Sequence, residues 1–224
     1  MISDFHASYQ RAYIERNVRL MIDMDDLHQF GRFVRLAAAL VAQEMNYSQL
    51  GREIGVTPQT AKRWLNALSQ AFIWFEVPAY SNHVIKRISE KSKGYFFDTG
   101  QICFSQMISS YEGIASHPLG SAIFENAVVN ELYQLTKRFN MPPQLYHWRL
   151  YSGAEVAIVI EFNGKFYPID IKANSRPSAK DARGIHAFRE NYPFLSIQKG
   201  LILAPTQERY AITPLDYVMP WDMK

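Results

Sequence analysis

The segment from Gly153 to Ala173, GAEVAIVIEFNGKFYPIDIKA, constrains the fold of this chain more than any other part of the sequence. Asn163 and Gly164 lie between two runs rich in Val, Ile, Phe and Tyr. This pair favours a two-residue hairpin, because both central positions of a type I′ turn need a positive φ. Phe162 would then pair with Lys165. The segment therefore predicts an antiparallel hairpin with a fixed register.

Counting back along this register sorts the side chains of the hairpin onto two faces. One face carries two cross-strand pairs, Ala157 opposite Asp170 and Glu155 opposite Lys172, with Cβ atoms roughly 5 Å apart. A carboxylate at position 157 would share a divalent metal with Asp170, so the alanine there decides whether a metal site is complete. The other face is the predicted core face and carries only apolar and aromatic side chains: Val156, Ile158, Ile160, Phe162, Tyr167, Ile169 and Ile171.

The composition is that of an ordinary globular protein. Its 224 residues are 48% hydrophobic and 20% charged, which suits one large domain or two small ones. Cys103 is the single cysteine, which excludes a disulfide framework and a cysteine-rich zinc site. The first residues lack the apolar core of a signal peptide, and the apolar stretch around 36–42 is too short to span a bilayer. We therefore expect a cytoplasmic protein without a membrane partner.

The segment 46–68, NYSQLGREIGVTPQTAKRWLNAL, predicts two short helices joined by a turn. Ser48 is a suitable N-cap for a helix that ends near Gly55, and Thr57 followed by Pro58 caps and starts a second helix. A helix-turn-helix presents the start and outer side of its second helix to the major groove of duplex DNA. The side chains expected there are Gln59, Thr60, Lys62 and Arg63.

Two predicted strands, 71–77 and 93–97, follow the helix pair and would form a wing. Six basic and two acidic residues give the stretch 62–93 a net charge of +4, against +3 for the whole chain. The same pattern also fits a packing or oligomerisation module. The wing loop would place four basic side chains near phosphate groups: Lys86, Arg87, Lys91 and Lys93.

The sequence predicts an α+β fold in two domains, a helical plus winged-helix domain over 1–105 and a second domain over 106–224. Residues 5–45 are expected to be helical, and Ser, Gly and His-Pro replace the periodic pattern between 105 and 120. The order of elements in the second domain indicates an α/β sandwich. It consists of a helix over 123–139, strands over 146–149, 156–162, 166–173 and 200–204, and a helix over 179–191.

Seven ordered segments resemble the C-terminal half of a large prokaryotic family of AAA-type ATPases: IERNVR, NYSQLGREIGVTPQTAKRWL, SNHVIKR, KGYFFDTG, LGSAIFENAVVNEL, HWRLYSGAEV and YPIDIK. In that family an ATPase core is followed by a winged helix and a domain similar to the PD-(D/E)XK nucleases. The resemblance implies these last two domains here. The chain has no G-x-x-x-x-G-K-[ST] loop, so we expect it not to bind ATP.

The same resemblance implies a set of site residues. In the nuclease superfamily two strand carboxylates, often joined by a helix Glu, hold Mg²⁺, which activates water that a lysine orients or deprotonates. Carried over, Asp170 is the second ligand, Lys172 is the water-positioning lysine and Glu125 is the helix carboxylate, with Glu131 as a weaker substitute. The family's Glu-Val-Asp reads Glu155-Val156-Ala157 here, so the first ligand is missing.

Three functions stay open from the sequence. We favour a DNA-associated protein with a winged helix and an inactive nuclease-like domain, which binds duplex DNA and needs no cofactor. The second is a Mg²⁺-dependent DNA nuclease in which Glu155 or Glu125 replaces the missing Asp. The third is a regulatory or protein-interaction module of an AAA-type ATPase, with an ATPase or a second copy of the chain as partner.

Some of these residues also have purely structural interpretations. Glu155 would form only a cross-strand ion pair with Lys172, Asp170 would be a solvated relic, and Glu125 would pair with a nearby base. His147 and His186 are expected to be surface or packing histidines, because no His-x-x-x-His spacing accompanies them.

Overall fold

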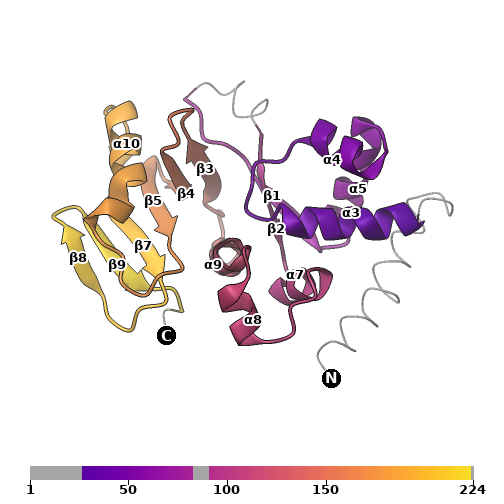
Figure 1. Ribbon diagram of the computed structural model, residues 1–224. Coiled ribbons are helices and arrows are strands. Elements are labelled where there is room, and N and C mark those ends of the chain that lie inside the picture. The colour runs from indigo at the N-terminus through magenta and orange to yellow at the C-terminus, as the bar shows by residue number, and fades with distance from the viewer. Residues whose placement is uncertain (1–26, 83–90, 223–224) are drawn as a thin grey trace. The chain divides into compact units, whose positions relative to one another are not determined.

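The computed structural model of the chain (Figure 1) describes residues 27–82 and 91–222. The first part of the helical region expected over 5–45 lies outside these described residues, and so do Lys86 and Arg87. Two compact units make up the chain: unit 1 is Met1–Glu76 with Lys93–Asn126, and unit 2 is Val77–Ser92 with Ala127–Lys224. The units therefore interleave along the sequence, whereas the sequence predicted one boundary near residue 105.

Unit 1 is built mainly from helices and contains one two-stranded sheet. The sheet pairs β1 with β2, and α9 begins in unit 1 and continues into unit 2. The elements are α3 (Leu27–Ala39), α4 (Tyr47–Ile54), α5 (Pro58–Gln70), β1 (Trp74–Val77), β2 (Lys93–Phe96), α7 (Thr99–Ser105), α8 (Tyr111–Ser116) and α9 (Gly120–Thr136).

The two helices predicted between 46 and 68 are confirmed as α4 and α5. Thr57 caps α5 and Pro58 begins it, as predicted. The cap of α4 is Asn46, whose Oδ1 accepts a hydrogen bond from the Gln49 amide at 3.2 Å, so the prediction of Ser48 was wrong. Asn46 lies one residue before the helix, where a side-chain oxygen reaches the free amides of the first turn.

Two glycines let α4 and α5 approach closely. Gly55 ends α4 at φ 84°, a conformation that glycine adopts without strain. A Cβ at Gly51 would lie 2.7 Å from the Val56 carbonyl oxygen. Behind this turn, Trp64 of α5 packs edge-on against Phe30 and Phe33 of α3, with ring centroids 5.6 and 5.2 Å away. The helix pair is thus held on a packed aromatic core.

Unit 2 is a mixed sheet covered on one face by α10. The sheet order is β3-β4-β5-β7-β9-β8; β3, β4 and β5 are antiparallel neighbours, whereas β5, β7 and β9 run parallel. The strands are β3 (Gln144–Arg149), β4 (Glu155–Phe162), β5 (Lys165–Ile171), β6 (Ser196–Ile197), β7 (Gly200–Ala204), β8 (Tyr210–Thr213) and β9 (Asp216–Pro220). A short helix η3 (Ala179–Ala182) leads into α10 (Arg183–Asn191). The α+β class is confirmed.

The hairpin turn and its register are confirmed near the turn. Asn163 and Gly164 have φ of 51° and 71°. Phe162 pairs with Lys165, and the aligned pairs continue as far as Ile158 with Ile169. The predicted pair of Ala157 with Asp170 lies one residue beyond this last aligned pair.

A β-bulge in β4 alters the predicted alternation of faces. Val159 is aligned with Tyr146 and Val156 with Trp148, so two residues of β4 between these pairs oppose one residue of β3. The extra residue places Val156 and Val159 in one core cluster with Phe188 of α10. The prediction that Val156 shares a face with Ile169 was therefore wrong, because the bulge reverses the alternation.

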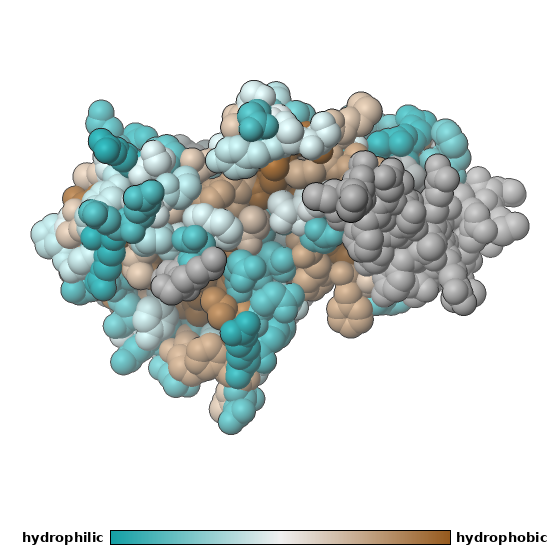
Figure 2. All heavy atoms as spheres, turned by 90° about the horizontal axis from the view of Figure 1, so that it is seen from below, coloured by the Kyte–Doolittle hydropathy of each residue, from teal (hydrophilic) through white to brown (hydrophobic). Residues whose placement is uncertain are grey.

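The surface of the described residues mixes polar and apolar side chains. Figure 2 shows brown, apolar residues lying beside teal, hydrophilic ones on the face that it presents. Exposed large apolar side chains include Met107 and Tyr111, and single residues of this kind are normal on a protein surface. No helix in the described part of the chain is long and apolar enough to cross a membrane.

Candidate functional sites

Apart from Pro58 at its start, the exposed side chains of α5 are polar or basic. Gln59, Lys62, Arg63 and Asn66 are exposed, and both Lys62 and Arg63 lie three or four residues from Gln59 and from Asn66, so the four form one stripe along the helix. The opposite face of α5 is buried through Ala61, Trp64, Leu65 and Leu68. Because α5 contains no acidic residue, the stripe is electropositive.

Of the four α5 residues predicted for DNA contact, Thr60 is the one that does not belong to the exposed stripe. It is half-buried, and its Oγ1 lies 3.0 Å from Oγ1 of Thr57 in the cap of the helix. Asn66 belongs to the exposed stripe and was missed. Helical spacing would have identified Asn66, because it follows Gln59 by seven residues, or about two turns, and so lies on the same face.

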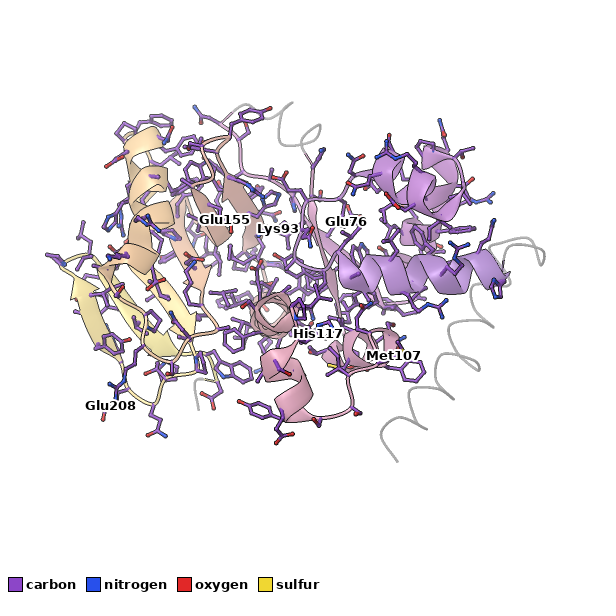
Figure 3. The ribbon with its side chains drawn as sticks, viewed as in Figure 1. Glu76, Lys93, Met107, His117, Glu155 and Glu208 are labelled. Carbon is purple, nitrogen blue, oxygen red and sulfur yellow. The ribbon has the colours of Figure 1, made fainter. Side chains whose placement is uncertain are left out.

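A carboxylate in unit 1 joins the helix pair to the small sheet. Glu76 of β1, labelled in Figure 3, accepts hydrogen bonds from the Tyr47 hydroxyl at 3.3 and 3.2 Å and from Trp74 Nε1 at 3.3 Å. Burial, then the charge and hydrogen bond of Glu76, raise the pKa of Tyr47 to about 12. Tyr47 therefore stays a neutral donor at physiological pH and fixes the start of α4 to β1.

Lys93 and Glu125 bind each other inside unit 1. Lys93 is 4% exposed, and its Nζ lies 3.1 Å from Oε1 of Glu125. The Tyr95 hydroxyl donates to the same oxygen at 2.9 Å. The structure therefore does not present Lys93 to a phosphate, which corrects that part of the predicted wing; Lys91 is exposed. Glu125 therefore matches its structural interpretation, in which it pairs with a nearby base.

Asp170 and Lys172 also pair with each other, at the end of β5. Asp170 is 4% exposed; its Oδ1 accepts from the Ile171 amide at 2.9 Å, and its Oδ2 lies 2.9 Å from Lys172 Nζ. Burial works against the ammonium, but Asp170, aided by Asp181 and Glu155, raises the pKa of Lys172 above its ordinary value. Lys172 is thus held protonated, which suits a hydrogen-bond donor rather than a base.

The other carboxylates around Lys172 are occupied elsewhere. Glu155 was the predicted partner of Lys172, but its Oε2 lies 4.0 Å from Arg149 Nη1. Lys172 pairs with Asp170 instead. Asp181 accepts from the amide and hydroxyl of Ser178 at 2.8 and 3.2 Å. Within residues 27–82 and 91–222, no three His, Cys, Asp or Glu side chains are grouped to hold a metal. These donors do not fit the Mg²⁺ site that the resemblance implies.

A second ionic cluster, missed from the sequence, ties α10 to β9. Asp216 is fully buried; its Oδ2 lies 2.6 Å from the Thr213 hydroxyl and 2.7 Å from Nε2 of His186, whose side chain is 43% exposed. Arg189 Nη2 lies 2.8 Å from Oδ1 as an ion pair without the alignment of a hydrogen bond. Burial opposes ionisation, but Arg189, Thr213 and His186 lower the pKa of Asp216.

An open pocket of about 610 Å³ lies between the loops that follow β5 and β7. Arg176 and Pro177 line it from one loop, and Pro205 and Glu208, the latter labelled in Figure 3, line it from the other. Tyr210 closes one side by donating its hydroxyl to the Pro177 carbonyl at 2.9 Å. The residues that line this pocket include none of the predicted site residues.

Two family models match the chain, and both are described as domains of unknown function. The first, DUF8612, matches residues 2–112, and the second, DUF4143, matches residues 121–223. The two matches divide the chain between residues 112 and 121.

Two curated mycobacterial proteins are similar to nearly the whole chain. The uncharacterized protein Rv2008c of Mycobacterium tuberculosis and the uncharacterized protein Mb2031c of Mycobacterium bovis are each 26% identical to it over 208 residues. The aligned region is 88% of this chain and 45% of each relative. The chain therefore spans less than half the length of these relatives.

Proposed function

We propose that this chain is a DNA-associated protein whose unit 1 binds duplex DNA through α5. The exposed stripe of Gln59, Lys62, Arg63 and Asn66 carries this proposal, because these are the side-chain types that contact phosphates and base edges. Its buried opposite face supports the proposal as well, since packing against Phe30 and Phe33 holds the helix in one orientation. The segments that resemble the AAA-type ATPase family, in which a winged helix follows the ATPase core, include this helix pair.

We assign unit 2 a nuclease-like fold without catalysis. Two observations support this assignment: alanine stands at position 157, and Asp170 binds Lys172 at 2.9 Å instead of standing free for a metal. A lysine that is paired in this way stays charged and does not take a proton from water. Unit 2 then serves as a scaffold or binding domain.

A role as a module of an AAA-type ATPase is the second candidate. The mycobacterial relatives are more than twice as long as the region that this chain matches, 45% of their length. Together with the resemblance of the seven segments, this favours an ATPase as a protein partner. Co-purification of the chain with a separately expressed AAA-type ATPase of the same genome tests this role. A complex that forms without DNA supports it.

Replacing Lys62 and Arg63 by alanine should flatten the salt dependence of duplex binding by up to about 2 units of log-log slope, because each phosphate contact contributes roughly 0.9. The measurement is fluorescence anisotropy of a labelled duplex at several salt concentrations. Lys137 and Arg138 form a matched exposed pair in unit 2, and alanine at both should leave the slope unchanged. Equal slopes for both double variants would contradict the role of α5.

The basic pair expected in the wing loop, Lys86 and Arg87, gives a parallel test. Lys86→Ala with Arg87→Ala should also lower the slope by up to about 2 units if the wing contacts phosphates. If the natural chain shows no salt-dependent binding of duplex DNA at low ionic strength, the proposal that it binds DNA is wrong.

Ala157→Asp should lower the free energy of unfolding by about 1 to 3 kcal/mol in metal-free buffer, because the site is 3% exposed and a new polar group loses its hydration there. Asp170 adds like-charge repulsion. Mn²⁺ should recover part of the loss, because two neighbouring carboxylates can share it. Urea denaturation with and without Mn²⁺ measures both effects, and Ala157→Asn controls for the added volume.

Nuclease assays on the natural chain decide between the inactive and active interpretations. We expect no cleavage of duplex or single-stranded DNA with Mg²⁺ or Mn²⁺ added. Metal-dependent cleavage that both Asp170→Ala and Lys172→Ala abolish would show that unit 2 is an enzyme.

A further inference from the structure

A cluster of two exposed cations and one half-buried tyrosine lies on neighbouring strands of unit 2. Lys199 directly precedes β7, Arg209 directly precedes β8, and Tyr217 lies in β9 between these two strands. Leu201 and Ala211 are the direct partners of Tyr217. Lys199 and Arg209 each lie two residues before such a partner, so alternation places both cations on the same face as Tyr217.

The side chains meet at the Tyr217 ring. Lys199 Nζ lies 3.1 Å from the Tyr217 hydroxyl and 4.9 Å from the ring centroid. The guanidinium carbon of Arg209 lies 4.7 Å from the same centroid. Cations are attracted to aromatic faces at such distances. The ring therefore gathers two positive charges that would otherwise repel each other.

No described carboxylate lies within ion-pair distance of Lys199 or Arg209. Asp216, the nearest acidic residue along β9, is on the other face, where Arg189 and His186 bind it. The hydrogen bond and charge of Lys199, together with the charge of Arg209, lower the pKa of Tyr217 against a small opposing effect of burial. The cluster is thus electropositive and uncompensated.

We propose that Lys199, Arg209 and Tyr217 form a binding site for a phosphate group. An ammonium, a guanidinium and a phenol hydroxyl supply several donors on one side, and phosphate oxygens accept charge-assisted hydrogen bonds from such groups. Asp170 faces the α10 side of the sheet, because its partner Ile202 belongs to the cluster that α10 covers. The phosphate site therefore lies on the opposite face and is separate from the predicted metal site.

The phosphate group has two sources, a nucleic-acid backbone and a free phosphate compound. A nucleic-acid backbone offers repeated phosphates, whereas a free anion uses the cluster once. The site does not depend on DNA binding by unit 1. A single-stranded oligothymidylate as the probe avoids α5, which is proposed to read duplex DNA.

The test compares the natural chain with K199Q/R209Q at low ionic strength. Calorimetry with inorganic phosphate, and anisotropy with a labelled oligothymidylate, should each show an affinity loss of about tenfold or more, because charged donors to phosphate contribute strongly. K180Q/R183Q is the matched control, since it removes two exposed cations from the same unit. It should leave phosphate affinity within about twofold if the site is local.

A second measurement uses the tyrosine itself. NMR of ¹³Cζ-labelled tyrosine should show the Tyr217 phenol titrating below its ordinary range in the natural chain, and K199Q/R209Q should return it upward. Phosphate should also shift the titration of Tyr217 upward, because a bound anion offsets the two cations. This readout stays informative even where binding is weak.

Each outcome decides the proposal. Binding of inorganic phosphate alone supports a free-phosphate site, and tighter binding of the oligothymidylate supports a backbone site. Absence of binding by both probes, or equal loss in K199Q/R209Q and K180Q/R183Q, overturns the proposal. If the amides of β7 and β9 stay protected from hydrogen exchange in K199Q/R209Q, this variant is folded.

Discussion

Replacing Asp216 by alanine is expected to destabilise unit 2 by about 3 to 5 kcal/mol, the range found when one partner of a buried ion pair is removed. Asp216 is fully buried, and Arg189, its partner at 2.8 Å, keeps 18% of its side chain exposed. The substitution leaves this guanidinium without its counter-charge. Thr213 and His186 lose their acceptor at the same time.

Urea denaturation measures this loss of stability. Hydrogen exchange of peptides from β7 and β9 then shows whether the loss lies within unit 2. Glu208→Ala is the control, because it removes an exposed carboxylate and surface changes of this kind cost less than about 0.5 kcal/mol. A similar stability for both variants would show that the Asp216 cluster does not hold α10 to β9.

The same carboxylate gives the stability of unit 2 a defined pH dependence. The folded state lowers the pKa of Asp216 below its ordinary 3.8. Its contribution is therefore complete above that value and is lost as the pH falls through the folded-state pKa. As the pH falls below 3.8, the natural chain should lose more stability than Asp216→Asn, which cannot titrate at this position.

Gly184→Ala is expected to cost about 3 kcal/mol or more, at the upper end of the range for overpacked sites. Gly184 lies at the start of α10, where a Cβ would come 1.7 Å from the carbonyl oxygen of Glu155. A backbone atom cannot move aside as a flexible side chain can. The helix must therefore lift from β4, which opens the cluster of Val156 and Phe188.

Gly31→Ala is the matched control, since it makes the same substitution inside another helix. A Cβ at Gly31 meets no heavy atom of the described residues within 4 Å, so alanine should stabilise α3 by up to about 1 kcal/mol through its helix propensity. Opposite signs for the two variants, measured by thermal unfolding and by hydrogen exchange in α10, would support the close approach. Stabilisation by both would contradict it.

Local sequence signals predicted those parts of the fold that depend on neighbouring residues. Asn163 and Gly164 set the hairpin register because the turn type fixes which residues pair. Thr57 and Pro58 located the start of α5 for a similar reason, since cap chemistry acts within one turn. The strands β8 and β9 were not predicted, because they are short and β8 has no fully buried residue to give a periodic pattern.

The candidate sites were harder to predict because they depend on distant residues. Lys93 looked like a wing cation, but Glu125, 32 residues away, binds it in the interior. His186 carried no motif, and its partner Asp216 lies 30 residues further along the chain. The pairing of Lys172 with Asp170 could not be read from the acidic-x-Lys pattern, because the same two side chains can hold a metal or each other.

The bulge in β4 has a consequence for changes in chain length. Two residues of β4, Ala157 and Ile158, lie between Val156 and Val159, whereas only His147 lies between their aligned partners Trp148 and Tyr146. A deletion of Ala157 would leave both valines facing the cluster that α10 covers, whereas deletion of a residue nearer the turn would shift the register of the hairpin. In this strand the bulge can absorb a deletion, and it includes position 157, where a metal ligand was expected.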